Sequence, residues 1–405
     1  MTDDALSAAV ELDARAVGSR CGGSRAGAWL VLGVSGAFGF YLGFRVYPNW
    51  QVAVETAQVV AGIVKYPAGN PFYIYHTKLW TILHQICAVA LLAGVSEITL
   101  SRVLSGVIGM VSIQALSLCT YAFCRRPWLS IGSGLFVLAT RSASNGANYP
   151  ILLMATEHTY GALGLSTFAL AGAALGAGLP GLGGFLVGLM PSIHPSLGLW
   201  LWIIVLLAVL WDVAYARAEF ARAFWWFAAG AAITTISLVV QLTVTYDVPK
   251  IDPAEAAKYF YAFVNFWDVH RSSVNINGLA VLVNRVVLGV GILWLLMFRS
   301  QLPRQAAFLL RMMVIGAAVG IAMAYASWIP PDRIPLSVLT VMPTRVLNFN
   351  GMIVVAALIG LIARYEEKWS AALLLVLLLG GLLLSNRSML WEWNVAAPWA
   401  GLQRG

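Results

Sequence analysis

Long apolar runs separated by short polar connectors dominate the chain. Most of the runs approach the roughly 20 residues that a helix needs to cross the hydrocarbon core of a bilayer. The runs predict spans at 27–46, 79–96, 103–123, 129–141, 150–176, 180–193, 197–212, 224–243, 276–298, 307–328, 348–363 and 369–385. A membrane β-barrel would show alternating strands of about ten residues instead. The pattern therefore predicts an all-α polytopic membrane protein with about ten to twelve transmembrane helices.

The polar connectors predict the topology. No soluble domain remains between the runs, so we expect residues 1–405 to form a single transmembrane domain. The tail at 1–25 ends in several arginines, and the positive-inside rule places it in the cytoplasm. The apolar run at 27–46 that follows the tail is longer than the hydrophobic core of a signal peptide, which indicates an uncleaved first helix. Later basic connectors fit cytoplasmic ends, so the loops at 47–78 and 245–275 are predicted to lie outside.

The topology is inconsistent at one place. Arg125 and Arg126 favour the cytoplasm, whereas the number of spans predicted before them puts them outside. We therefore expect one element within 124–158 to be re-entrant or broken. Irregular backbone at membrane depth is tolerated only where it lines protein or a water-filled cavity.

Composition supports a membrane protein, because 60% of residues are hydrophobic, 10% are charged and the mean hydropathy is +0.80. Soluble domains carry about 25% charged residues. The net charge of +8 comes from basic residues scattered between apolar runs, which indicates orientation signals and excludes a nucleic-acid partner. The four cysteines, which lack metal-ligand spacing and are predicted to be structural, are Cys21, Cys87, Cys119 and Cys124.

The first external loop contains a candidate catalytic acid, Glu55. On a helix, Gln51, Glu55 and Gln58 form a polar stripe, and an apolar stripe accompanies it. This pattern predicts a helix that lies flat at the membrane interface. A carboxylate held there can act as a general base or hold a metal ion. A solvated loop acid without a function is the alternative.

Other ionisable candidates come from later loops. Glu157 and His158 directly precede an apolar run, where ionisable side chains are costly and often functional, although Glu157 or Thr156 could simply cap the next helix. His194 lies in a turn fenced by prolines and is either a ligand or an ordinary loop histidine.

Two further positions could bind phosphate. Asp268, His270 and Arg271 occur together before a predicted span, and Arg345 opens another. Arginine matches phosphate through its forked donors. The alternative for Arg271 is an arginine that snorkels to lipid headgroups.

In the order of these features the chain resembles the polytopic glycosyltransferases of the GT-C class. The resemblance includes Glu55 in a long first external loop, the stretch Tyr66–Pro71, Glu157 before a helix, the His194-Pro turn after a Gly-rich helix, and Met-Pro-x-Arg345 late in the chain. The paired acids of the family's first loop are represented here by Glu55 alone, so the base assignment and a divalent metal both stay open.

The resemblance implies transfer of a sugar from a polyprenyl-phosphate-linked donor to a glycan, lipid or protein acceptor on the extracytoplasmic side. It implies that Glu55 is the base and that Glu157 or Asp268 is a second acid. Arg271 and Arg345 would hold the carrier phosphate. The implied substrate-binding residues are His158, His194, His270, Arg271 and Arg345.

Other functions use the same kinds of residue. A transporter or flippase would use such residues to move a lipid-linked or anionic substrate across the membrane. A surface-polysaccharide polymerase or ligase would also transfer sugars at the membrane interface. A scaffold subunit would neither transport nor catalyse. Transporters place ionisable groups near the bilayer midplane, whereas here they lie in loops and at helix ends. A composition rich in Ala and Gly, with more Arg than Lys, is compatible with a bacterial inner membrane.

Overall fold

The computed structural model describes residues 25–67, 70–140, 156–247, 273–298, 301–330 and 341–365, together with a few isolated positions between them. No strand occurs in these ranges, which confirms the predicted all-α class. Seven of the described helices are long and apolar enough to cross a membrane, or eight if one bent pair forms a single span. The protein is therefore an all-α polytopic membrane protein.

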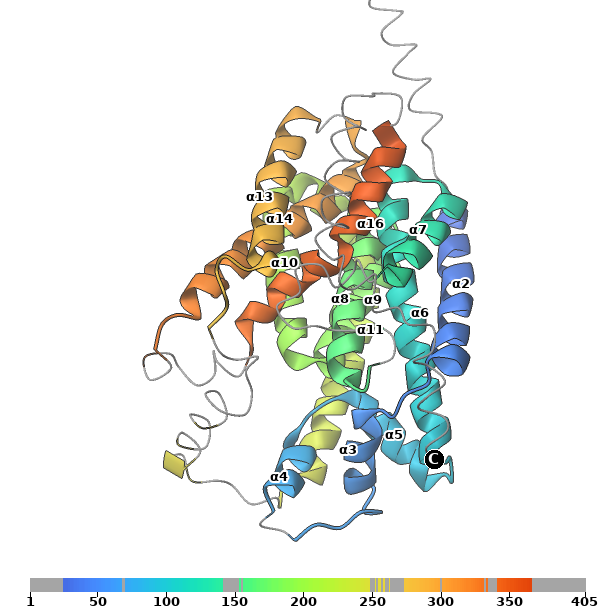
Figure 1. Ribbon diagram of the computed structural model, residues 1–405, viewed down its shortest axis with the longest axis vertical. Helices are drawn as coiled ribbons and strands as arrows, with labels where there is room; N and C mark the ends of the chain where they lie inside the picture. Colours follow the sequence, from blue (N-terminus) through green and yellow to red (C-terminus); the bar gives the residue numbers. More distant parts are fainter. Residues whose placement is uncertain are drawn as a thin grey trace, which may run out of the picture.

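The helices, labelled as in Figure 1, follow one another closely along the chain. The elements are α2 (Arg25–Tyr41), η1 (Leu42–Val46), α3 (Val52–Val60), α4 (Pro71–Lys78), α5 (Ile82–Leu92), α6 (Glu97–Cys124), α7 (Pro127–Ala139), α8 (Thr159–Ala177), α9 (Pro180–Ile193), α10 (Pro195–Trp211), α11 (Val213–Val244), α13 (Leu279–Met297), α14 (Arg304–Ala326), η7 (Pro343–Val346) and α16 (Leu347–Tyr365). The last predicted span, 369–385, lies outside the described residues.

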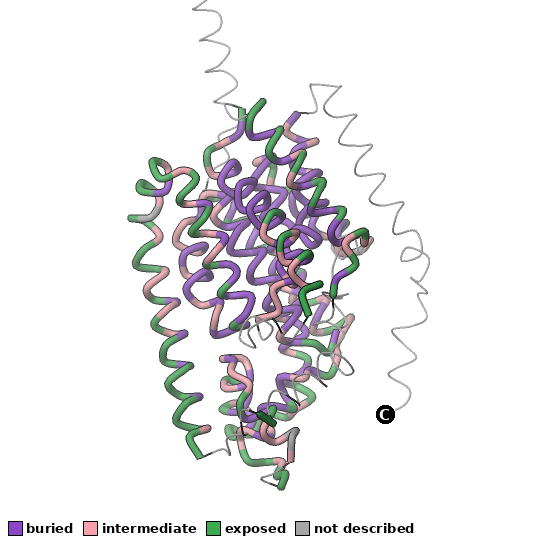
Figure 2. Tube along the Cα trace, turned by 90° about the vertical axis from the view of Figure 1, so that its left-hand side faces the viewer, coloured by how far each residue is buried: buried purple, intermediate pink, exposed green. Residues whose placement is uncertain are grey.

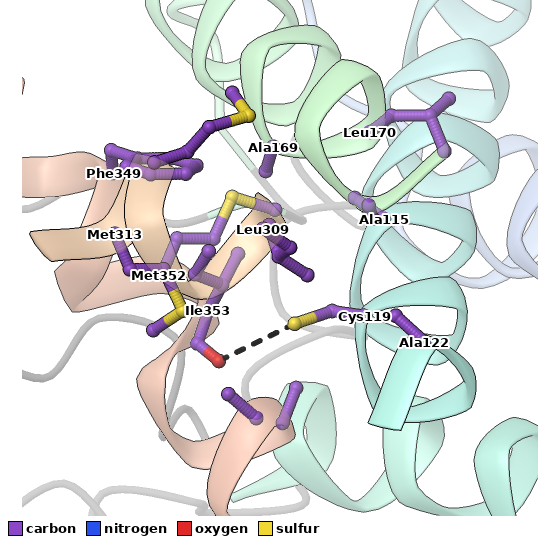
Figure 3. Packing of buried hydrophobic residues seen from close by; sticks show 14 of the residues in the cluster. Ala115, Cys119, Ala122, Ala169, Leu170, Leu309, Met313, Phe349, Met352 and Ile353 are labelled. Atoms are coloured by element: carbon purple, nitrogen blue, oxygen red, sulfur yellow. Dashed lines mark hydrogen bonds between the residues drawn. The ribbon is translucent and has the colours of Figure 1, made fainter. Parts of the chain in front are cut away.

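Four helices form the centre of the bundle. In the membrane-length windows of α6, α8, α14 and α16 most residues are buried, reaching 89% in α8, whereas the value for α11 is 22%. Figure 3 shows the junction, where Cys119 on α6 packs toward Ile353 on α16 between side chains of α8 and α14. Cys87, Cys119 and Cys124 are free and buried, in agreement with the structural role predicted for them. Buried positions are concentrated in the bundle centre, and exposed ones lie on the peripheral helices (Figure 2).

Close helix contacts depend on small residues. A Cβ atom at Gly188 of α9 would collide with the backbone of Phe227 on α11, and one at Gly230 would collide with the backbone of Phe185. Small residues let membrane helices approach until their backbones touch. The glycines of α9 and α11 therefore let these two helices pack in direct backbone contact.

α5 does not cross the membrane, although a span was predicted at 79–96. Its 11 residues extend roughly 16 Å, about half of the hydrocarbon thickness. α5 packs with α3 and the start of α6 in a separate small core that includes Ala57, Cys87 and Leu104. Figure 1 shows α3, α4 and α5 together at one end of the bundle, beside the first turns of α6. We call this the loop end.

Removing that span resolves the inconsistency at Arg125 and Arg126. Because the chain stays at the loop end from η1 to the start of α6, α6 returns to the end where α2 begins. We call this the basic end. There Arg125 Nη1 donates to the carbonyl of Ala177 at 2.6 Å, and Arg364 Nη1 donates to the carbonyl of Phe123 at 3.3 Å. Cations at helix C-termini satisfy free carbonyls and complement the helix dipole.

α9 and α10 form a helical hairpin that enters the bundle from the basic end. His194 is at once the last residue of α9 and the N-cap of α10. Trp202 Nε1 donates to the carbonyl of Val187, which joins the two antiparallel arms. The tip packs against Gly164, five residues into α8. The hairpin therefore stops roughly 8 Å short of the loop-end terminus of α8.

This topology can be tested by labelling. Lys65→Cys and Ser96→Cys should react with a membrane-impermeant maleimide from the same side, and Arg126→Cys from the other, because α5 does not cross the membrane. All three positions are exposed, Cys87, Cys119 and Cys124 are buried, and Cys21, which lies outside the described residues, is replaced by Ser in every variant. Labelling of Lys65→Cys and Ser96→Cys from opposite sides would contradict the structure.

Candidate active site

Buried Gln51 joins three elements at the loop end. Its side chain is 1% exposed. Its Nε2 donates to Ser105 Oγ on α6 at 3.1 Å and to the carbonyl of Thr156 at 2.8 Å, and its Oε1 accepts from Thr159 Oγ1 on α8 at 2.7 Å. The backbone N–H of Val52 also donates to the carbonyl of Glu157 at 3.1 Å. The start of α3 is thus fixed to the start of α8.

The first loop contains the predicted helix. Gln51 bonds to Ser105, and Gln58 Nε2 donates to Glu97 Oε1 at 3.3 Å, so α3 runs antiparallel along the first turns of α6. Of the stripe, only Glu55 is exposed. Gln51 is buried because Ser105 and Thr159 satisfy its amide, a compensation that periodicity alone does not reveal.

The structure brings Glu55 and Glu157 to the same corner. Glu55 is exposed on α3, and Trp50 Nε1 donates to Glu55 Oε1 at 2.7 Å. Glu157 and His158 are both more than half exposed, with 4.0 Å between Glu157 Oε1 and His158 Nε2. Glu157 does not cap α8, because the N-cap residue is His158 and it makes no side-chain cap bond. The two carboxylates are therefore accessible from the loop end.

A buried histidine lies directly behind Glu55. His76 on α4 is 9% exposed, and its Nδ1 is 2.9 Å from Oγ1 of Thr56, the residue that follows Glu55. Burial lowers the pKa of His76 below its usual 6.5, and the negative charge of Glu55 partly opposes this shift. At neutral pH the imidazole is therefore uncharged.

A second buried histidine continues this cluster. His84 on α5 is fully buried, its ring meets that of Tyr160 edge to face at 6.4 Å, and its Nε2 is 3.3 Å from Gln241 Oε1 on α11. Sequence reasoning assigned no role to His76 or His84. For His84 a signal was present, because a histidine within an apolar run is itself unusual.

Arg345 and His194 meet where the α9–α10 hairpin ends. Arg345 Nη1 is 3.1 Å from His194 Nε2. Arg345 belongs to the short helix η7, which follows Met342 in a left-handed conformation at φ 43°. Trp200 Nε1 on α10 donates to the carbonyl of Val341 at 3.1 Å and fixes this turn to the hairpin. Two segments 151 residues apart thus form one pair.

The hydrogen bonding of this pair suits an anion. His194 Nδ1 also faces the backbone N–H of Leu197 at 3.3 Å. A neutral imidazole has one acceptor nitrogen, so it cannot accept from both Leu197 and Arg345. If Nδ1 caps α10, then Nε2–H and the guanidinium of Arg345 are both donors directed at the same region. An anionic oxygen placed there would accept from both, and the N-terminus of α10 adds a favourable dipole.

The remaining predicted residues cannot be placed. Asp268, His270 and Arg271 lie outside the described residues. Within the described ranges, no group of three or more His, Cys, Asp or Glu side chains is arranged to hold a metal ion. Two pairs therefore carry the candidate site, Glu55 with Glu157 and His194 with Arg345.

The chain matches no protein-family model, no curated protein and no solved structure.

We expect Gln51→Met to loosen α3 from α8, because it removes the partner of Thr159 Oγ1 and of the Thr156 carbonyl. Buried polar groups left without partners destabilise by about 1–3 kcal/mol each. The variant should unfold at a lower temperature in detergent than the wild type. Gln58→Met, which removes a partly exposed bond, is the control; equal effects of the two changes would contradict the role given to Gln51.

Proposed function

We propose that the protein is an integral membrane glycosyltransferase of the GT-C type. It would transfer a sugar from a polyprenyl-phosphate-linked donor to an acceptor on the extracytoplasmic side of a bacterial inner membrane. In this orientation the basic end and the N-terminus face the cytoplasm, because basic residues are enriched on the cytoplasmic side. The loop end is then the catalytic side.

The observation that carries the proposal is the pairing of Arg345 with His194, which packs against Gly164 near the end of α8 where Glu157 bonds to α3. Sugar transfer from a lipid phosphate needs a base for the acceptor hydroxyl and cationic or donor groups for the leaving phosphate. These two requirements correspond to the two pairs. Both arise from loops and helix ends, where a lipid phosphate at headgroup level is within reach.

The proposed chemistry assigns one role to each pair. Glu55 accepts the proton of the acceptor hydroxyl while the hydroxyl oxygen attacks the anomeric carbon of the sugar. The bond between that carbon and the phosphate oxygen breaks, and the electron pair leaves with the phosphate. Arg345 and His194 donate hydrogen bonds to the phosphate as its charge grows. Glu157 lies beside Glu55 and would orient the acceptor.

Transport is the second candidate, and a different observation favours it. Arg311 on α14 pairs with Asp212 at 2.7 Å, with side-chain exposures of 6% and 20%. Asp212 lies at the 115° bend between α10 and α11. Ionisable pairs and broken helices inside a membrane bundle are typical of transport paths. Arg311 lies only about 10 Å from the basic end of α14, however, and not near the midplane. Movement of a lipid-linked sugar from one leaflet of a proteoliposome membrane to the other, dependent on the protein, would favour transport.

Glu55→Gln should abolish sugar transfer, because the amide cannot accept the proton of the acceptor hydroxyl. Loss of a general base typically lowers the rate about 10²–10⁴-fold. Transfer from a panel of radiolabelled polyprenyl-phosphate hexoses in proteoliposomes measures this effect. Glu97→Gln changes an acid at the same end and should retain activity. Turnover retained by Glu55→Gln would remove Glu55 from the mechanism.

Arg345→Met should weaken both donor binding and turnover, because it removes the guanidinium that faces His194 and would donate to the carrier phosphate. Removing one donor to a developing charge costs about 10²–10³-fold in kcat. Arg345→Lys should recover part of the loss, since it keeps the charge without the fork. Arg102→Met at the exposed start of α6 is the control. The same assay gives KM and kcat, and wild-type kinetics for Arg345→Met would rule out this role.

A further inference from the structure

The buried cluster behind Glu55 has no role in the chemistry described above. Glu55 and Thr56 are neighbours on α3, and Glu55 points outward while Thr56 is fully buried. Thr56 Oγ1 and His76 Nδ1 share a hydrogen bond of 2.9 Å. The imidazole is therefore fixed on the inner side of the helix that carries the carboxylate.

The groups around His76 come from three other helices and from α4 itself, and two of them, Glu55 and Lys78, carry a full charge at neutral pH. Glu55 belongs to α3, Tyr160 to α8 and His84 to α5, while Tyr75 and Lys78 are on α4 itself. Glu55 acts electrostatically on His76 and on Tyr160, and His76 acts on His84. Lys78 is exposed at the end of α4. The negative charge of Glu55 is thus the one that faces the buried groups.

Burial makes this region sensitive to charge. His84 is fully buried, and its Nδ1 forms no hydrogen bond within the described residues. A low local dielectric strengthens the effect of a new charge on its neighbours. A proton added to His76 would therefore act strongly on Glu55.

We propose that His76 is a positioning residue for Glu55: Thr56 holds its ring on the inner side of the helix that carries the carboxylate, and a positive charge on the ring weakens the base. This inference rests on the proposed role of Glu55 as the base. It predicts that activity falls at acidic pH because His76 gains a proton, and not because Glu55 does. We call this fall the acidic limit.

The direction of the pH dependence of activity follows from the direction in which burial shifts the pKa of His76. Because burial lowers the pKa of His76 below 6.5, the imidazole is neutral at pH 7 and gains its proton only in more acidic solution. Above that pKa the base is fully active. Below it the rate should fall to a lower level, because a charged imidazole makes Glu55 a weaker base.

Titration by NMR tests the coupling without any substrate. In detergent-solubilised protein labelled with ¹⁵N-histidine, the His76 signal is identified by its loss in His76→Asn. Its midpoint should lie below 6.5 in the wild type and move lower still in Glu55→Gln, because the carboxylate that favours the imidazolium is gone. Glu97→Gln should leave it unchanged. An unchanged midpoint in Glu55→Gln would overturn the inference.

The dependence of sugar transfer on pH provides the second readout. Asn can offer Thr56 a hydrogen-bond partner near the position of Nδ1 but does not titrate, so His76→Asn should keep activity at pH 7 and lose the acidic limit. Thr56→Val, which keeps the imidazole but not its hydrogen bond, should retain an acidic limit at a shifted pH. An acidic limit that persists unchanged in His76→Asn would assign it to another group and overturn the inference while transfer itself stands.

The two readouts separate the inference from the proposed function. Coupled titration without sugar transfer from any donor tested would refute the glycosyltransferase proposal and leave the electrostatic link between His76 and Glu55 established. Sugar transfer without a change in the His76 midpoint would support the glycosyltransferase proposal and refute the electrostatic link between His76 and Glu55.

Discussion

The thickness of the bilayer is the constraint on which the arrangement depends. A helix of 11 residues cannot cross it, so α5 turns back and the segment from η1 to the start of α6 remains at one end. Three consequences follow from this single fact. α6 returns to the end where α2 starts, Arg125 joins the other arginines there, and α3 is placed where it can contact α8.

Sequence reasoning predicted the class of the fold and most of the helices, because apolar runs of membrane length are a strong signal. It failed where length and polarity gave conflicting answers. The run at 79–96 is apolar enough for a span, but Trp80, Gln85 and His84 bond to polar groups on α11. The regular helix begins only after its N-cap Thr81 and ends at Leu92. Which polar residues will find partners across the bundle depends on tertiary contacts, and a single chain pattern does not contain them.

In the candidate site, too, some features could be predicted from the sequence and others depend on tertiary contacts. The sequence indicated which loops carry acids, histidines and arginines, and the pairing of His194 with Arg345 gives two of those residues a common location. The burial of Gln51 and His76 was not predictable, since each depends on a partner more than 19 positions away. A glutamine or histidine in a polar loop is indistinguishable from a solvated one until such partners are known.

The arginines of the basic end combine two duties that are separate in many membrane proteins. In the proposed orientation Arg125 and Arg364 belong to the cytoplasmic charge that directs insertion, and the same guanidinium groups bond to the carbonyls that end α8 and α6. Neutralising either residue to invert the protein would therefore also fray the helix that it caps. Insertion topology and the stability of these two helix ends would then depend on the same two side chains.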